Sequence, residues 1–301
     1  MNKNLISRYI WLADTVKTHG PLSRERIDEL WRKSALGEGN PLPERTFYNY
    51  RRAVEEIFKI EIECNSRGEY YIPGEEEGES NGMTDWLLDS FAVNNLFVDS
   101  PDISGRIEIE EVPSAREFLP TVIKAMGERE KIRFDYAGFN RSLTERGIEF
   151  SPFFLKRYKQ RWYMIGEKGK GRDIRTYALD RIKAMTCSGE HYEMPEGMEI
   201  SDVLGNIVGV TSSKADERTV RIETTRTQAK YFRALPLHRS QQEELTDSDR
   251  SVFRYRLKLN YELVHELMSL GDGVKVLEPK ELQLMVTNEL RKALGRYENF
   301  S

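Results

Sequence analysis

Two alternating segments joined by a turn rich in glycine and lysine constrain the fold of this chain most strongly. They lie within residues 156–183, where Trp162 and Met164 share one side of the first segment. Side chains that alternate with a period of two are typical of a half-buried β-strand. Gly169 and Gly171 lie in the turn, where a hairpin needs residues that tolerate positive φ. The sequence therefore predicts a β-hairpin over this range.

The hairpin ends a basic stretch of the chain. Residues 131–183 hold fourteen lysines and arginines against six acids, a net charge of +8, whereas the whole chain of 301 residues has a net charge of -4. Residues 74–112 are acidic instead, with Arg106 as the one basic residue against eleven acids. A basic segment inside an acidic chain indicates a local anionic partner.

The same region resembles the WYL domain. Residues 162–164, WYM, resemble the signature triplet of that family with Met in place of Leu, and residues 175–182, RTYALDRI, resemble its downstream companion. Met is a flexible apolar residue, so we expect packing at that position to survive. The resemblance covers residues 114–185. It implies a small Sm-like β-barrel with a basic groove, which acts as a sensor behind an N-terminal winged helix in bacterial transcription factors.

The first part of the chain predicts three helices and a hairpin. Apolar residues recur at helical spacing over residues 5–19, a second helix begins after its N-cap Ser23, and a third runs over residues 43–58. Residues 60–72 then alternate around a polar tip. This order of elements predicts a winged helix-turn-helix in residues 1–73, with the third helix in the major groove of duplex DNA.

The third helix has an inward and an outward side. The inward residues at helical spacing are Phe47, Tyr50, Val54, Ile57 and Phe58. The candidate DNA contacts lie on or beside the outward side, or at the hairpin tip: Arg45, Thr46, Tyr48, Asn49, Arg51, Arg52 and Arg67. Arg45 and Asn49 are candidate base readers, because arginine pairs with guanine and asparagine with adenine. Arg51 and Arg52 are candidate phosphate contacts. The helix also carries a balanced number of acids, so a small helical dimerisation domain is the alternative interpretation.

The next stretch predicts a connection. Residues 74–82 are charged and glycine-rich, as in a linker, and residues 83–98 have the apolar periodicity of a helix. That helix packs either on its own chain or against a second copy, and a winged helix that reads a two-fold operator needs a homodimer. Residues 106–112 predict a strand. We therefore expect a linker region over residues 74–113 and a WYL domain over residues 114–194.

The WYL region is expected to form a small, strongly bent antiparallel barrel. An amphipathic helix over residues 114–127 precedes a strand over residues 131–136, and a strand over residues 147–155 is broken at Pro152. A second linker, rich in Gly, Ser and Asp, is expected over residues 195–217.

The last part of the chain, residues 215–301, alternates between strand and helix patterns. This alternation predicts a ferredoxin-like α+β domain, so the fold class is multidomain α+β. Residues 267–282, LMSLGDGVKVLEPKEL, resemble the C-terminal extension that accompanies WYL domains.

The WYL region also supplies candidate ligand contacts. An anionic ligand with bases needs guanidinium groups for phosphate and aromatic faces for stacking. The candidates are Tyr136, Ser151, Arg157, Lys159, Arg161, Tyr163, Arg172, Arg175 and Arg181. Arg175 and Tyr163 are the strongest of them, and a basic and aromatic groove is geometrically possible. Trp162 is expected in the barrel core instead, and Arg181 has an alternative role as the ion-pair partner of Asp180.

The sequence gives no indication of catalysis. No GxSxG, Walker or HExxH motif is present, and the two cysteines and four histidines do not cluster, which argues against a zinc site and for a reducing cytoplasm. No apolar run is long enough to span a membrane, and the first residues are amphipathic rather than a signal peptide. We therefore expect no enzyme activity, no cofactor, no metal and no membrane association.

Together these features predict a cytoplasmic transcriptional regulator. It would bind a double-stranded DNA operator as a homodimer and sense a single-stranded nucleic acid or nucleotide effector through the WYL domain. The alternative is an RNA- or single-stranded-nucleic-acid-binding module without operator recognition, because Sm-like barrels with basic grooves serve that role elsewhere.

Overall fold

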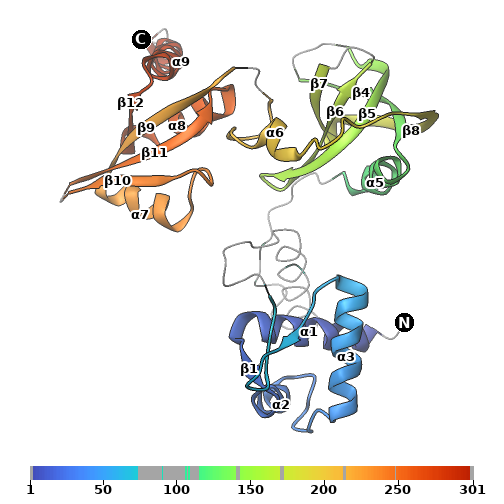
Figure 1. Cartoon of the computed structure of the whole chain (residues 1–301). Coiled ribbons are helices and arrows are strands. Elements are labelled where there is room, and N and C mark those ends of the chain that lie inside the picture. The colour runs from blue at the N-terminus through green and yellow to red at the C-terminus, as the bar shows by residue number, and fades with distance from the viewer. Residues whose placement is uncertain are drawn as a thin grey trace. The chain divides into compact units, whose positions relative to one another are not determined.

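The computed structural model divides into two compact units, residues 1–110 and 111–301 (Figure 1). It describes residues 3–73, 90, 106, 108, 115–139, 143–169, 173–212, 215–247 and 249–298. The linker at 74–82, the helix predicted over 83–98 and the strand predicted over 106–112 lie outside the described residues, apart from those isolated positions. So does Arg172. No helix in the described part of the chain is both long and apolar enough to cross a membrane.

The N-terminal unit contains three helices and a small antiparallel sheet. The elements are α1 Lys3–His19, β1 Leu22–Ser23, α2 Arg24–Lys33, α3 Glu44–Phe58, β2 Glu63–Cys64 and β3 Glu69–Tyr71. The strand order is β1-β3-β2, so the short strand between α1 and α2 pairs with the second strand of the hairpin. Ser23 caps α2, because its hydroxyl oxygen accepts from the backbone N–H of Arg26 at 3.3 Å.

One face of α3 builds the core of this unit. Phe47, Tyr50 and Val54 are buried there, as the helical spacing predicts, together with residues of α1 and α2. Ile57 was expected inward but is 46% exposed. It lies in the last turn of the helix, just before Lys59 takes a left-handed conformation with φ 58°, so the chain turns away at that point.

The first half of the second unit is a five-stranded antiparallel sheet with one α-helix. The elements are the 3₁₀ helix η2 Arg116–Phe118, α5 Leu119–Glu128, β4 Glu130–Tyr136, β5 Glu145–Tyr158, β6 Arg161–Lys168, β7 Asp173–Ala178, the 3₁₀ turn η3 Leu179–Arg181 and β8 Ile182–His191. The strand order is β7-β6-β5-β4-β8, and the predicted hairpin is β6 with β7 (Figure 1). Val122 and Ala125 of α5 are buried in one cluster with Phe134 and Phe150 of the sheet.

Pro152 bends β5 without ending it. The strand is continuous over residues 145–158, so the predicted break is wrong. The register between β5 and β6 shifts after Pro152, which accommodates a residue without an N–H donor. Opposite this point stands Gly166, where a Cβ atom would lie 1.9 Å from the carbonyl oxygen of Ser151. The bend therefore requires glycine on the facing strand.

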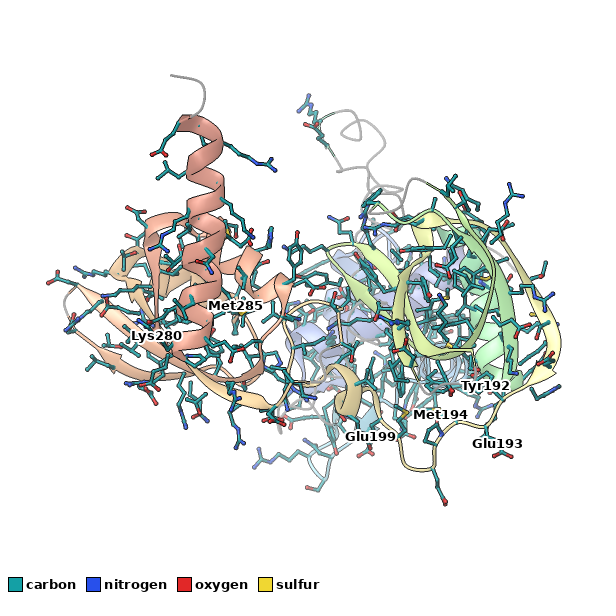
Figure 2. All side chains as sticks on the ribbon, turned by 90° about the horizontal axis from the view of Figure 1, so that it is seen from above. Tyr192, Glu193, Met194, Glu199, Lys280 and Met285 are labelled. Atoms are coloured by element: carbon teal, nitrogen blue, oxygen red, sulfur yellow. The ribbon has the colours of Figure 1, made fainter. Side chains whose placement is uncertain are left out.

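The second half of this unit has the order βαββαβ followed by a helix. The elements are β9 Glu217–Thr225, α7 Arg226–Ala234, β10 Gln242–Thr246, β11 Arg250–Lys258, α8 Tyr261–Ser269, the 3₁₀ turn η4 Gly271–Gly273, β12 Val274–Glu278 and α9 Lys280–Glu298. The sheet order is β10-β11-β9-β12, and all neighbours are antiparallel. Helices α7 and α8 share one hydrophobic core, against which Met285 of α9 packs (Figure 2).

The segment between the two halves is packed rather than a plain linker. Figure 2 shows Tyr192 and Met194 where the chain leaves β8, and Glu199 just before the short helix α6 Ile200–Leu204. Val203 and Leu204 are buried with Ile165 of β6, which the composition of this segment did not predict. A hydrogen bond from the Tyr192 hydroxyl to the Pro152 carbonyl holds the start of the segment on the sheet.

Residues 208–211, which we call the strap, are held from two sides. From the first half of this unit, Lys156 Nζ donates to the Gly209 carbonyl at 2.6 Å and the Thr176 hydroxyl donates to the Val210 carbonyl at 2.8 Å. From the C-terminal half, Asn260 Nδ2 donates to the Val208 carbonyl at 2.8 Å, and Glu262 Oε1 accepts from the strap backbone at 3.0 Å. The strap therefore links β5 and β7 with the start of α8.

Candidate nucleic-acid and ligand interfaces

The outward face of α3 carries polar side chains at helical spacing. Arg45, Tyr48, Asn49 and Arg52 are all exposed and occupy positions i, i+3, i+4 and i+7, so they share one face. Within the described residues, Arg45 and Arg52 form no ion pair. A helix with free guanidinium groups and an amide on one face can hydrogen-bond to phosphates and base edges.

Two of the predicted DNA contacts on α3 are less exposed than this outward face. Thr46 and Arg51 are half-buried, and the guanidinium carbon of Arg51 lies 5.8 Å from the centre of the Tyr70 ring. The hydroxyl of Tyr48 lies 3.3 Å from that of Tyr70, and burial raises the pKa of Tyr70. These contacts fix α3 against β3, so Arg51 supports the helix from its side rather than standing on the outward face.

Arg67 lies at the tip of the β2–β3 hairpin and is exposed. The turn is fixed by Asn65, whose Oδ1 accepts from the backbone N–H of Arg67 at 2.9 Å and of Glu69 at 3.0 Å. Gly68 has φ 78°, a conformation that glycine adopts without strain. The backbone of the tip is therefore defined while the guanidinium of Arg67 is left exposed.

A second site is an open cavity of about 750 Å³, lined mainly by the first half of the second unit and also by Thr211 of the strap and Tyr261 of α8. It gathers three of the predicted ligand contacts, Tyr136, Arg175 and Arg181. Its further lining residues are Gly138, Phe139, Glu145, Lys168, Thr176, Tyr177, Thr211 and Tyr261. Among the described residues, three cations, Lys168, Arg175 and Arg181, line this cavity together with the rings of Tyr136 and Tyr177, which we call its aromatic floor.

The tyrosines of this floor belong to the hydrophobic core. The Tyr177 ring lies 4.9 Å from that of Tyr136 and 5.0 Å from that of Phe134, both edge to face. Burial raises the pKa of Tyr177 and of Tyr136 above the ordinary value, so both hydroxyls stay neutral at physiological pH. The floor can therefore offer hydrogen-bond donors and ring edges, but no negative charge of its own.

The three cations that line the cavity differ in whether they form an ion pair. Arg175 pairs with Asp173 at 2.6 Å and Lys168 with Glu145 at 2.5 Å, and both pairs are partly open to water. Arg181 forms no ion pair in the described part of the chain. Its guanidinium carbon lies 3.8 Å from the centre of the Phe139 ring, and its buried Nε has no hydrogen-bond partner there. The guanidinium of Arg181 therefore carries a positive charge at the cavity without an acidic partner among the described residues.

The pairing register separates Arg175 from Tyr163. On β6 and β7, Gly166 faces Arg175, Met164 faces Tyr177 and Tyr163 faces Ala178. Because directly paired residues share a face of the sheet and neighbours along a strand alternate, Tyr163 and Arg175 point to opposite faces. Of the two strongest predicted ligand contacts, only Arg175 lines the cavity among the described residues.

The remaining predicted contacts also lie apart from this cavity. Arg161 pairs with Asp180 at 3.0 Å, so Asp180 is the partner of Arg161 and not of Arg181. Lys159 pairs with Glu266 at 2.7 Å. Arg157 is exposed and does not line the cavity, and Ser151 is buried at 4% exposure within β5.

Sequence reasoning missed Lys168 and Phe139 as cavity residues. Lys168 ends β6 directly before the hairpin turn, where its pairing with Asp173 brings it beside Arg175. The position of Lys168 beside Arg175 could have been predicted from the alternation of the two strands and the length of the turn between them. Phe139 is 74% exposed in the loop after β4, and no periodic pattern covers it. The described residues contain no group of three or more His, Cys, Asp or Glu side chains that could hold a metal ion.

Comparisons with known proteins agree with this division of the second unit. A WYL domain model matches residues 117–187, and a WCX domain model matches residues 216–294. Among solved structures, the chain is similar to proteasome accessory factor B/C (PafBC) of Arthrobacter aurescens, with 20% identity and a TM-score of 0.36. That match covers 95% of this chain and 46% of PafBC, so this chain spans about half of its length.

A second solved structure, titled a CRISPR Cas-related protein, is 12% identical with a TM-score of 0.37, and the match covers 98% of this chain and 86% of that one. The comparison with curated proteins gives no match. The chain therefore contains a WYL domain at residues 117–187, followed by a WCX domain at residues 216–294.

Proposed function

We propose that this protein is a DNA-binding transcriptional regulator. In this proposal residues 1–73 are a winged helix-turn-helix, the WYL domain is a small Sm-like barrel, and the WCX domain is a ferredoxin-like fold. The observation that carries the proposal is the outward face of α3, where Arg45, Asn49 and Arg52 are exposed together and the two arginines have no acidic partner among the described residues. An unpaired basic and amide face on a helix is suited to the major groove.

The WYL cavity is proposed as the effector site. Its volume of about 750 Å³ falls within the range of small-molecule sites, and its three cations fit a phosphate-bearing ligand. The hydroxyl donors and ring edges of the aromatic floor fit the edge of a nucleobase, so the proposed ligand class is a nucleotide or a short single-stranded nucleic acid. The protein acts here as a binder and not as an enzyme.

The protein would bind DNA as a homodimer, so that two copies of α3 read a two-fold operator.

The test is selection of duplexes from a random pool by the purified full-length protein, followed by a salt titration on the winning sequence. The proposal predicts an enriched inverted repeat whose half-sites lie about one helical turn, or a multiple of it, apart. The affinity should fall steeply with salt, because phosphate contacts release counterions. Absence of any enriched duplex, together with tight binding of single strands, would favour the RNA- or single-strand-binding alternative instead.

The effector site gives a separate prediction. The double variant Arg175→Ala, Arg181→Ala removes two of the three cations and should weaken binding of a fluorescent oligonucleotide of single-stranded DNA by roughly tenfold or more, since each charge-assisted hydrogen bond contributes about 1.5–3 kcal/mol. Operator affinity without effector should stay unchanged. Arg157→Ala is the matched control, because Arg157 is exposed but does not line the cavity. Equal loss in the control variant would contradict a site at this cavity.

A further inference from the structure

A second cavity, of about 490 Å³, lies in the same unit between the WYL and WCX domains. It is bounded by the end of β5, by the strap and by α7. Tyr158, Val208, Phe232 and Leu235 provide apolar walls, and Lys156 and His238 are polar lining residues. It shares no lining residue with the cavity of Arg175 and Arg181. A concave, mostly apolar space with a few convergent polar groups is the usual form of a small-molecule site.

Lys156 is an incompletely satisfied cation in this cavity. Its amine donates to the Gly209 carbonyl at 2.6 Å and forms no ion pair within the described residues. An ammonium group carries three donors, so two remain for other partners. Burial lowers the pKa of Lys156, which means that its surroundings do not compensate the loss of water around the charge. A half-buried ammonium of this kind is stabilised when an anion binds beside it.

Charges of both signs surround Lys156. A smaller cavity of about 340 Å³ shares Lys156 and His238 and adds Arg239. The positive charge of Arg239 acts against protonation of Lys156, and the carboxylate of Glu262 acts in its favour. Glu262 forms no ion pair with Lys156 in the described part of the chain: its Oε1 accepts from the hydroxyl of Thr211 at 2.6 Å, and its buried Oε2 has no hydrogen-bond partner there. Glu262 therefore offsets part of the positive charge but leaves the Lys156 amine without a direct anionic partner.

The imidazole of His238 lines the site in its neutral form. Its Nδ1 accepts from the backbone N–H of Ser240 at 3.1 Å, so the ring proton lies on Nε2, which donates to the Gly205 carbonyl at 2.9 Å. Burial lowers the pKa of His238 and keeps the ring neutral. Of the described lysines that line the apolar space, Lys156 is the one without an ion-pair partner, because Lys159 pairs with Glu266.

We propose that this cavity binds a small amphipathic anion, with its apolar body against Tyr158, Phe232 and Leu235 and its carboxylate, or a similar anionic group, on Lys156. The site is distinct from the proposed effector cavity, and its ligand differs in class because the walls are apolar rather than lined by several cations. The ligand would contact the strap and α7 at once, and so would bind where the WYL and WCX domains meet.

The experiment compares two fluorescent probes of nearly equal apolar size on the full-length protein. 8-Anilinonaphthalene-1-sulfonate carries one anionic group, and N-phenyl-1-naphthylamine has the same rings without it. We expect the wild-type protein to bind the sulfonate more tightly than the neutral probe, by about tenfold or more, because the sulfonate accepts a charge-assisted hydrogen bond from Lys156. Lys156→Met should remove this preference and keep the affinity for the neutral probe. Lys275→Met, the same change at an exposed position of β12, should keep the preference.

Leu235→Glu provides a second variant, in case Lys156→Met impairs folding. Leu235 is 82% exposed at the rim, so the change is tolerated by the fold and places a negative charge beside the site. It should weaken binding of the sulfonate several-fold more than binding of the neutral probe. Equal affinity of the wild-type protein for the two probes would overturn the proposal. A sulfonate affinity that neither Lys156→Met nor Leu235→Glu changes would overturn it as well.

Discussion

Replacing Arg45 and Asn49 together by alanine is expected to abolish discrimination between the selected operator and random duplex DNA. Each bidentate contact between a side chain and a base edge contributes about 1–3 kcal/mol of discrimination, so two contacts contribute roughly 2–6 kcal/mol. This corresponds to a loss of about 30-fold to 20,000-fold in the ratio of specific to nonspecific affinity, at about 1.4 kcal/mol per tenfold. The ratio is measured by competition binding at fixed salt.

Arg52→Ala is the matched control for this pair. Arg52 lies on the same exposed face of α3 but is expected to contact phosphate. Its replacement should weaken specific and nonspecific binding alike and lower the dependence of log K on log salt by about 1. If the double variant of Arg45 and Asn49 behaved like Arg52→Ala, with both affinities reduced by the same factor, these two residues would not be base readers.

Phe134→Ala is expected to destabilise the second unit by about 3–5 kcal/mol, as large-to-small changes of buried aromatic residues do. The Phe134 ring is 1% exposed and makes edge-to-face contacts with Tyr136, Phe150 and Tyr177. Its removal leaves a cavity under the floor of the proposed effector site. Because whole domains are stable by only about 5–15 kcal/mol, the variant should lose much of its folded population on mild heating.

Urea denaturation followed by circular dichroism measures this loss, and hydrogen exchange of the β4 and β5 amides assigns it to this unit. Phe139→Ala is the comparison, since Phe139 is 74% exposed and its removal should change the free energy of unfolding by no more than about 1 kcal/mol, the contribution of its cation–π contact with Arg181. Similar destabilisation by the two variants would mean that the Phe134 ring is not part of a packed core.

Patterns within a single element were the best guides to this fold. The alternation around Trp162 and Met164 predicted the hairpin of β6 and β7, and the helical spacing of Phe47, Tyr50 and Val54 predicted the inward face of α3. These patterns report on which side of an element is apolar, and that side must be buried against something. The same logic predicted the strand and helix order of the C-terminal half.

Relations between elements were predicted less well. Arg175 and Tyr163 each lie on a correctly predicted strand, but whether they share a face depends on the register, which a one-residue shift reverses. The same register determines that Lys168 lines the cavity, because it pairs Lys168 with Asp173. The segment around α6 was taken for a linker because of its Gly, Ser and Asp content, yet a few apolar residues such as Val203 and Leu204 were enough to bury it. Composition averages over a window and therefore hides a short buried turn.

The strap also limits how the second unit can be divided or recombined. Its carbonyl groups accept hydrogen bonds from Lys156 and Thr176 on one side and from Asn260 on the other, so a cut at this point leaves donors on both fragments without acceptors. A chimaera that joins this WYL domain to the WCX domain of a relative would have to preserve the hydrogen bonds that side chains of β5, β7 and the start of α8 form with the strap. In this chain the unit of exchange is consequently the WYL and WCX pair, not either domain by itself.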